Sequence, residues 1–447
     1  MFQRKLIAVL SVVALLAVTA GTGHASLSRV ESMGLGSPAL SQLTEDYVNI
    51  YAFPASVVRQ NNLVFAEFGA NDPDGDVNPV RPFDQSFTLV RNFPKLGVIS
   101  LQMKQSAQNL NSGSSSSSSN LQDNANNEWF DLIWGKAFSK MDFALRLDVT
   151  NSSFEETDVT GGVTNSYKAK GADFSFDPYP FGSGNYFQDA IDGTGVELNT
   201  MGITPSIALH MANDNRLDLA ATYRTYDLNR SNNDTPTAQK WEDSGNASYS
   251  LNARYFINKS DASQWYLAGW YRNDDLSYSI TGYETAVVTA DETYKSYGIG
   301  VSNNLKVNDN NLLVWGLSVW EAKHDYSRGD TQGGAFDIRE ESDKTTMLPV
   351  LFAGIETQAT SWLKLRMGGT NSITSFEQDQ SDFITPANSF NEKEDFTNFE
   401  LSLGAGIKFN NLDVDMTLNN QFPLSGGYIL SGNQAAPFNR VSATYHF

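Results

Sequence analysis

Apolar and polar side chains alternate along many segments of this chain. From Phe143 to Val149 every second residue is apolar, while Asp142, Arg146 and Asp148 occupy the positions between them. Side chains of an extended strand point alternately to its two faces, so each segment predicts a strand with one dry face and one wet face. The same pattern recurs at 217–224, 249–257, 363–367, 401–409, 412–418 and 438–447.

The polar face of these strands repeatedly carries full charges of both signs. In a soluble sandwich the apolar faces would be hidden between two sheets. Apolar residues facing lipid and polar residues facing a wet interior are typical of a transmembrane barrel. The alternation therefore predicts an all-β fold, a transmembrane antiparallel up-and-down β-barrel.

The connections between the strands alternate in length. Short turns rich in Asn, Asp, Gly or Ser are predicted at 94–95, 139–140, 212–215, 258–263, 308–311, 359–361 and 410–411. Long polar stretches lie between them, at 70–82, 106–127, 151–195, 229–244, 285–292, 327–342, 378–393 and 422–436. Short periplasmic turns and long extracellular loops are the barrel pattern. It predicts about sixteen strands within residues 61–447, or fourteen if one weak pair is not formed.

The last strand reads F-N-R-V-S-A-T-Y-H-F, from Phe438 to Phe447. Its ending, Tyr445-His446-Phe447, resembles the C-terminal signature of bacterial outer-membrane β-barrel proteins. The resemblance implies that Tyr445 and Phe447 are an insertion signal read by the barrel-assembly machinery. The resemblance also implies that the protein is located in the cell outer membrane.

The first residues of the chain predict export. Arg4 and Lys5 precede an apolar run from Leu6 to Ala20, and small residues follow up to Ala25. This is the pattern of a secretory signal peptide over residues 1–25, cleaved after Ala25. The alternative is a membrane anchor, but the run is shorter than the ~20 apolar residues that a spanning helix needs.

Residues 26–60 do not show strand alternation. Gly34, Gly36 and Pro38 interrupt the segment, and its apolar residues keep a rough helical spacing. The run Tyr51-x-Phe53-Pro54-Ala55 resembles the start of the long-chain fatty-acid transporter family, whose barrels carry an N-terminal plug with an Asn-Pro-Ala motif. Phe53 stands where that motif has Asn. Residues 26–60 are expected to form a plug inside the lumen or a periplasmic arm against the rim, and the plug residues would be Leu40, Leu43, Tyr47, Tyr51, Phe53 and Pro54.

Charged residues on the wet faces are the candidate lining of a pore. By alternation the inward residues are Arg146, Asp148, Asp218, Arg224, Arg366, Asp413, Asp415 and Arg440. Charged groups that line a pore set its selectivity, and a barrel of about sixteen strands is wide enough for water. The alternative is that these groups pair across a blocked interior and only neutralise each other.

Composition excludes several other functions. The net charge of −20 disfavours binding to nucleic acid, and the absence of cysteine excludes disulfides and thiolate metal sites. The acidic run 72–78 gathers oxygen ligands, but it lacks the Gly and Glu positions of an EF-hand and is expected to be a solvent-exposed turn. His324 and Asp325 are adjacent, so on a strand they point to opposite faces and make no catalytic pair. No enzyme activity, cofactor or metal is expected.

The sequence thus predicts an outer-membrane channel for passive diffusion of small solutes. Two alternatives remain, a transporter of hydrophobic compounds like the fatty-acid family, and a structural or adhesive barrel. The expected partners are a small-molecule solute, outer-membrane lipid and lipopolysaccharide, the barrel-assembly machinery and, for some channels, a second copy of the same chain.

Overall fold

The structure is a computed structural model of the chain. It describes residues 26–60, 62–70, 83–106, 124–160, 163–169, 195–232, 239–243, 245–283, 286–332, 335–382, 389–418 and 438–447. The predicted signal peptide and the acidic run 72–78 lie outside the described residues.

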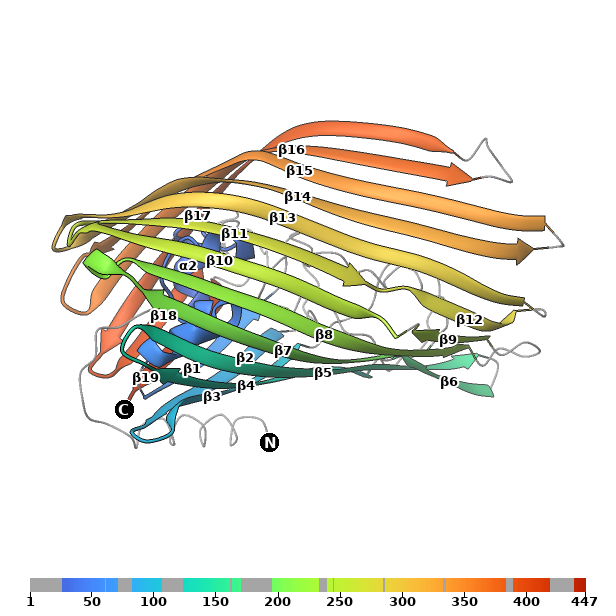
Figure 1. Cartoon of the computed structure of the whole chain (residues 1–447), viewed down its shortest axis with the longest axis horizontal. Coiled ribbons are helices and arrows are strands. Elements are labelled where there is room, and N and C mark those ends of the chain that lie inside the picture. Colours follow the sequence, from blue (N-terminus) through green and yellow to red (C-terminus); the bar gives the residue numbers. More distant parts are fainter. Residues whose placement is uncertain are drawn as a thin grey trace.

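Antiparallel strands close into a ring (Figure 1). Within the described residues the ring has sixteen strands. In ring order they are β1 (Leu63–Ala70), β2 (Phe83–Phe93), β3 (Gly97–Ser106), β4 (Asn124–Ala137), β5 (Met141–Thr160), β7 (Gly195–His210), β8 (Arg216–Asn232), β10 (Ala247–Ser260), β11 (Ser263–Asp275), β13 (Ala286–Asn308), β14 (Asn311–Gln332), β15 (Ala335–Gln358), β16 (Leu363–Asp382), β17 (Phe390–Phe409), β18 (Leu412–Leu418) and β19 (Phe438–His446).

The first and last strands close the barrel. β1 pairs with β2 on one side and with β19 on the other, in a register that runs from Leu63 opposite His446 to Gly69 opposite Arg440. Closure joins the first strand to the last, so that the described part of the ring has no open seam between β1 and β19, as β-structure in lipid requires. The prediction of an antiparallel barrel of about sixteen strands is confirmed.

The side chains point as the alternation predicted. On β10, Leu251 is exposed on the outer face, whereas Asn252 and Arg254 are buried in the interior. On β5, Leu147 and Val149 are exposed while Arg146 and Asp148 are buried. In a soluble protein the apolar side chains face the interior and the charged ones face water. Here the apolar side chains face outward and the charged ones face inward, as expected for a barrel surrounded by lipid.

The tight turns lie where the sequence predicted them, but several predicted loops are strands. The stretches 285–292, 327–342 and 378–393 belong largely to β13, β14, β15, β16 and β17. β13, β14 and β15 contain 23, 22 and 24 residues, although a membrane strand needs only ~9–11. These hairpins therefore project beyond the bilayer on the loop side, and Figure 1 shows them as the long arrows that run away from the tight turns.

Three short strands lie outside the ring on the loop side. They are β6 (Val163–Ala169), which pairs with the extension of β5, β9 (Gln239–Asp243), which pairs with β8 and β12, and β12 (Tyr278–Tyr283), which pairs with β13. The short helix η4 (Ala212–Asp214) forms the turn between β7 and β8. β6 and β9 occupy parts of the stretches that had been predicted as loops.

Residues 26–60 lie inside the ring, as short helices beside the tight-turn end (Figure 1). They are α2 (Leu27–Ser32), α3 (Pro38–Ser41), α4 (Asn49–Ala52) and η1 (Pro54–Arg59). Ser37 caps α3 by accepting a hydrogen bond from the Leu40 amide, at 3.3 Å, and Pro38 takes the first helical position, where no amide proton is needed. No helix in the described part of the chain is both long enough and apolar enough to cross a membrane.

The link between α2 and α3 passes very close to the barrel wall. Gly34 has φ of +74°, a left-handed conformation that favours glycine, and a Cβ there would lie 2.8 Å from the Gly369 nitrogen of β16. Gly368 of the same strand leaves room for the backbone of Met33. Glycines on both surfaces therefore let the segment contact the backbone of the wall directly.

A charge on the outer face tests this orientation. Leu317→Arg on β14 is expected to destabilise the barrel by about 2–4 kcal/mol, because arginine would face the hydrocarbon near its middle. Thr346→Arg is the matched control. Thr346 lies opposite Glu321 on the loop-side extension, where arginine would meet water. Equilibrium unfolding in lipid vesicles measures the difference, and equal stability of the two variants would contradict the assigned faces.

Candidate functional site: the occupied interior of the barrel

The N-terminal segment, residues 26–60, bridges the lumen from wall to wall. On one side the Ser28 and Ser442 hydroxyls lie 2.6 Å apart, next to β1 and β18. On the other side the Ala55 amide donates to the Ser206 hydroxyl of β7 at 3.2 Å. Hydrogen bonds and ion pairs of the segment reach β1, β2, β5, β7, β8, β10, β13, β15, β18 and β19.

A buried cluster around Asp218 holds the middle of the segment. The Asp218 carboxylate of β8 accepts from Arg254 of β10 at 2.8 Å and from Arg216 at 2.8 Å. Arg254 is 0 % exposed and also donates to the carbonyl oxygens of Gln42 and Thr44, at 3.3 and 3.2 Å. One arginine of the wall thus connects a wall carboxylate to the backbone of the inner segment.

A second arginine, on β5, also connects a wall carboxylate to the backbone of the inner segment. Arg146 donates to Asp131 of β4 and, at 2.9 Å, to the carbonyl oxygen of Tyr51. Its guanidinium lies 5.7 Å from the centre of the Tyr51 ring and 5.8 Å from that of Trp129. Cation–π contacts of this kind are strongest away from water, and Arg146 is buried.

The segment's own charges bind the opposite wall. Arg29 of α2 donates to Glu356 of β15 at 2.9 Å and to Asp46 of the segment at 3.3 Å. Glu356 also accepts from Arg366 of β16 at 2.6 Å. Arg29 and Glu356 thus each pair with more than one group of opposite charge, which offsets the cost of burying them.

All eight predicted pore-lining residues face the interior. Arg224 pairs with Asp148 at 3.0 Å, Arg366 with Asp415 at 2.6 Å, Arg440 with Glu31 at 2.9 Å and His446 with Asp413 at 3.4 Å. With Arg146 and Asp218, most of these groups are engaged with one another or with the inner segment. Their role in selectivity remains a prediction.

Several residues of this site were not singled out from the sequence. Arg254 occupies an inward position in the alternation of β10, so the alternation alone could have identified it as a residue of the interior. Asp131 and Glu356 alternate with apolar residues in the same way, whereas Arg29 and Arg59 of the segment gave no such signal. Arg59 lies 3.5 Å from Asp142 of β5, a contact that exists only once the segment is inside the ring.

The apolar residues of the segment are buried. Leu40 and Leu43 belong to one cluster with Val314 and Phe352 of the wall. Tyr47, Tyr51, Phe53 and their neighbours belong to a second cluster, which includes Phe65 and Val90. The six residues expected as a plug are all buried, namely Leu40, Leu43, Tyr47, Tyr51, Phe53 and Pro54.

Phe53 has a different role from the Asn that the fatty-acid transporter motif places there. The Arg254 guanidinium lies 4.6 Å from the centre of the Phe53 ring, and the ring is completely buried. A side-chain amide would bind its own backbone nearby. The phenyl ring instead packs on the wall arginine that holds Gln42 and Thr44.

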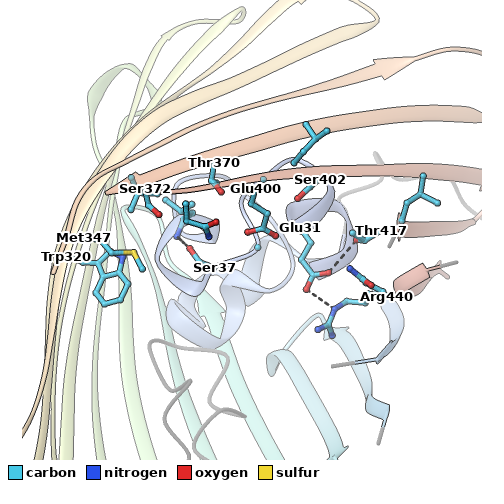
Figure 2. Close-up of a pocket in the computed structure, with 18 residues that line it drawn as sticks. Glu31, Ser37, Trp320, Met347, Thr370, Ser372, Glu400, Ser402, Thr417 and Arg440 are labelled. Atoms are coloured by element: carbon cyan, nitrogen blue, oxygen red, sulfur yellow. Dashed lines mark hydrogen bonds and ion pairs between the residues drawn. The ribbon is translucent and has the colours of Figure 1, made fainter. Parts of the chain in front are cut away.

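A cavity of about 410 Å³ lies between the segment and strands β14 to β19 (Figure 2). Gly34, Gly36, Ser37 and Leu40, from the link between α2 and α3, form its side toward the tight turns. It lies on the loop side of the Arg366 and Glu356 pair. The cavity therefore lies in the lumen, next to the N-terminal segment.

The C-terminus lies at the tight-turn end. The Phe447 amide donates to the carbonyl oxygen of Asn62 at 3.0 Å, and the Arg91 guanidinium lies 5.1 Å from the centre of the Phe447 ring. Tyr445 lies in β19, opposite Val64 and Leu412. Reading of these two aromatic residues by the assembly machinery remains a prediction.

The adjacent histidine and aspartate on β14 have different partners. His324 lies 3.0 Å from Glu292, whereas Asp325 accepts from Ser342 at 2.9 Å and pairs with Lys323 at 2.8 Å. Within the described ranges no group of three or more His, Cys, Asp or Glu side chains is placed to hold a metal ion.

A closed antiparallel ring with an apolar exterior, a charged interior and short turns at the end that holds the C-terminus defines an outer-membrane β-barrel protein. No family model and no curated protein matches the chain.

Among solved structures, the chain is similar to bacterial outer-membrane proteins. The toluene transporter TodX of Pseudomonas putida is 9% identical, with 96% of this chain and 97% of that chain covered and a TM-score of 0.38. The toluene transporter TbuX of Ralstonia pickettii is 11% identical, with 93% and 96% covered and a TM-score of 0.35. The siderophore receptor PirA of Acinetobacter baumannii is 9% identical, with 80% and 62% covered and a TM-score of 0.35.

Proposed function

We propose that this protein is a gated channel that admits small solutes through the outer membrane. The observation that carries the proposal is the N-terminal segment, which lies across the lumen and binds walls on opposite sides of the ring. A sixteen-stranded ring alone is wide enough for an aqueous passage. The segment is what would restrict diffusion.

The way the segment is held supports gating. Its contacts with the wall include many hydrogen bonds and ion pairs, such as Arg29 to Glu356 and Ser28 to Ser442. Water can replace such bonds when the segment moves, so a neutral hydrogen bond contributes only about 0.5–1.5 kcal/mol net and a bond to a charged group about 1.5–3 kcal/mol. The cavity beside the α2–α3 link gives a solute a place to arrive before the passage opens.

Single-channel recording in planar bilayers tests this function. The full-length protein is expected to give discrete but infrequent openings. Poly(ethylene glycol) small enough to enter the pore should lower their conductance, and polymer above a sharp size cut-off should leave it unchanged. Steady high conductance, as in an unobstructed pore, would contradict gating. Complete absence of current under all voltages and solutes would contradict a channel.

A transporter of hydrophobic compounds is the second candidate. It is favoured by the apolar side of the cavity, formed by Leu40, Trp320, Met347 and Val350. Toluene uptake into protein-containing vesicles, with no ionic current, would favour this candidate over the channel.

A further inference from the structure

The cavity between the segment and β14–β19 has two unlike sides (Figure 2). In the figure, Trp320 and Met347 stand at one side, and Glu31, Thr417 and Arg440 at the other. The pairing of β15 with β16 shifts register between Met347 and Val350, so both residues reach the cavity although they are three positions apart. The register shift thus brings two apolar side chains, Met347 and Val350, to the same side of the cavity.

The other side is rich in groups that both donate and accept hydrogen bonds. Hydroxyl and amide side chains occur on the α2–α3 link and on the three neighbouring strands β16, β17 and β18, namely Ser37, Thr370, Ser372, Asn398, Ser402 and Thr417. A hydrocarbon could satisfy none of these groups. A ligand with several hydroxyls matches them, because a hydroxyl also donates one bond and accepts others.

Trp320 adds an apolar aromatic surface to a lining that is otherwise rich in polar groups. Its indole is a large flat apolar surface, and it lines the cavity at the end where Met347 and Ser372 also stand. A sugar ring has C–H groups on its faces and hydroxyls around its edge. Such a molecule can lie on the indole and direct its hydroxyls to Thr370, Ser372 and Ser402.

The charges of the cavity disfavour anions. Glu31 and Arg440 form an ion pair at 2.9 Å, and the Thr417 hydroxyl donates to Glu31 at 3.4 Å. Glu400 is exposed to the cavity, and among the described residues it has no ion-pair partner. The lining therefore keeps one carboxylate in excess, which would repel a carboxylated or phosphorylated solute.

We propose that this cavity binds an uncharged polyhydroxylated solute of mono- to disaccharide size. Its volume of about 410 Å³ falls in the range of roughly 300–1,000 Å³ that small-molecule sites occupy. The inference rests on the proposed channel function, because it identifies the class of solute that the channel admits.

Isothermal titration calorimetry of the full-length protein tests the proposal. The protein is kept in dodecyldimethylamine oxide, since a maltoside detergent would itself compete. Maltose is expected to bind, and glucuronate and toluene are not. Binding of toluene without maltose, or of none of the three, would overturn the proposal.

Two substitutions locate the site. Trp320→Ala is expected to weaken maltose binding about tenfold, the upper range for loss of an aromatic contact, while Trp362→Ala, outside the lumen, leaves it unchanged. Glu400→Gln should keep maltose affinity within a few-fold and admit glucuronate. Resistance to heat denaturation on gels verifies that each variant is folded. Unchanged maltose binding in folded Trp320→Ala would overturn the assignment.

The bilayer experiment separates this inference from the proposed function. Gated currents without maltose binding would overturn the sugar site and leave the channel standing. Maltose binding to a protein that never conducts would overturn the channel.

Discussion

Removal of residues 26–60, with the export signal retained, is expected to convert infrequent openings into a steady current. Conductance should rise by roughly an order of magnitude or more, because an empty ring of sixteen strands leaves an aqueous channel. The segment binds wall strands on all sides of the lumen, so its loss removes the obstruction as a whole. Single-channel recording in planar bilayers measures the change.

Folding of the deletion variant has to be verified separately, since buried wall arginines lose their partners. Arg254→Met is a milder companion, which removes the donor to Gln42 and Thr44 and fills similar volume. It should increase the frequency of openings without a change in their size. A folded deletion variant with the currents of the full-length protein would show that residues 26–60 do not restrict the passage.

Asp218→Ala is expected to destabilise the barrel by about 3–5 kcal/mol, since it leaves buried guanidinium groups without their carboxylate. Asp218 is 1 % exposed, and Arg254 and Arg216 both bind it at 2.8 Å. The segment should also loosen, because Arg254 then loses the wall carboxylate that positions it. Urea unfolding in detergent micelles measures the first effect, and limited proteolysis measures the second.

The matched control for this variant lies on the same strand. Asp227 is exposed, so Asp227→Ala should change the unfolding free energy by no more than about 0.5 kcal/mol. Asp218→Glu keeps the charge and should recover part of the loss. Equal effects at Asp218 and Asp227 would mean that the buried cluster does not hold the interior together.

The barrel could be predicted from the sequence because lipid imposes a period of two on each strand. Leu251 and Asn252 differ in environment only through this alternation. The tight turns were equally predictable, since turns such as Asn410-Asn411 need residues that tolerate unusual dihedrals, and Asn410 indeed has φ of +53°.

The loop-side hairpins could not be predicted in the same way. Beyond the bilayer both faces of a strand meet water, so alternation disappears while the backbone ladder continues. Residues 340–344 of β15 read E-E-S-D-K, a composition that resembles a loop. Only pairing with β14 and β16 makes them a strand.

The interior site was predictable only in part. The alternation along the strands correctly predicted that Arg146 and Asp218 face the interior. It could not show that Arg146 binds the Tyr51 carbonyl, because this contact joins distant parts of the chain. The cavity combines the α2–α3 link with residues of six strands. No local sequence pattern predicts this cavity, because it forms only where the N-terminal segment packs against the six strands.

A single engineered disulfide tests most directly whether the segment lies inside the ring. The chain contains no cysteine, and the hydroxyls of Ser28 and Ser442 are 2.6 Å apart, so the double variant S28C/S442C places two thiols within bonding reach. The disulfide is expected to form in isolated outer membranes, to suppress the channel openings and to release them on reduction, while S442C alone gives normal currents. Two free thiols in the folded double variant under oxidising conditions would contradict the seated segment and the gate built on it.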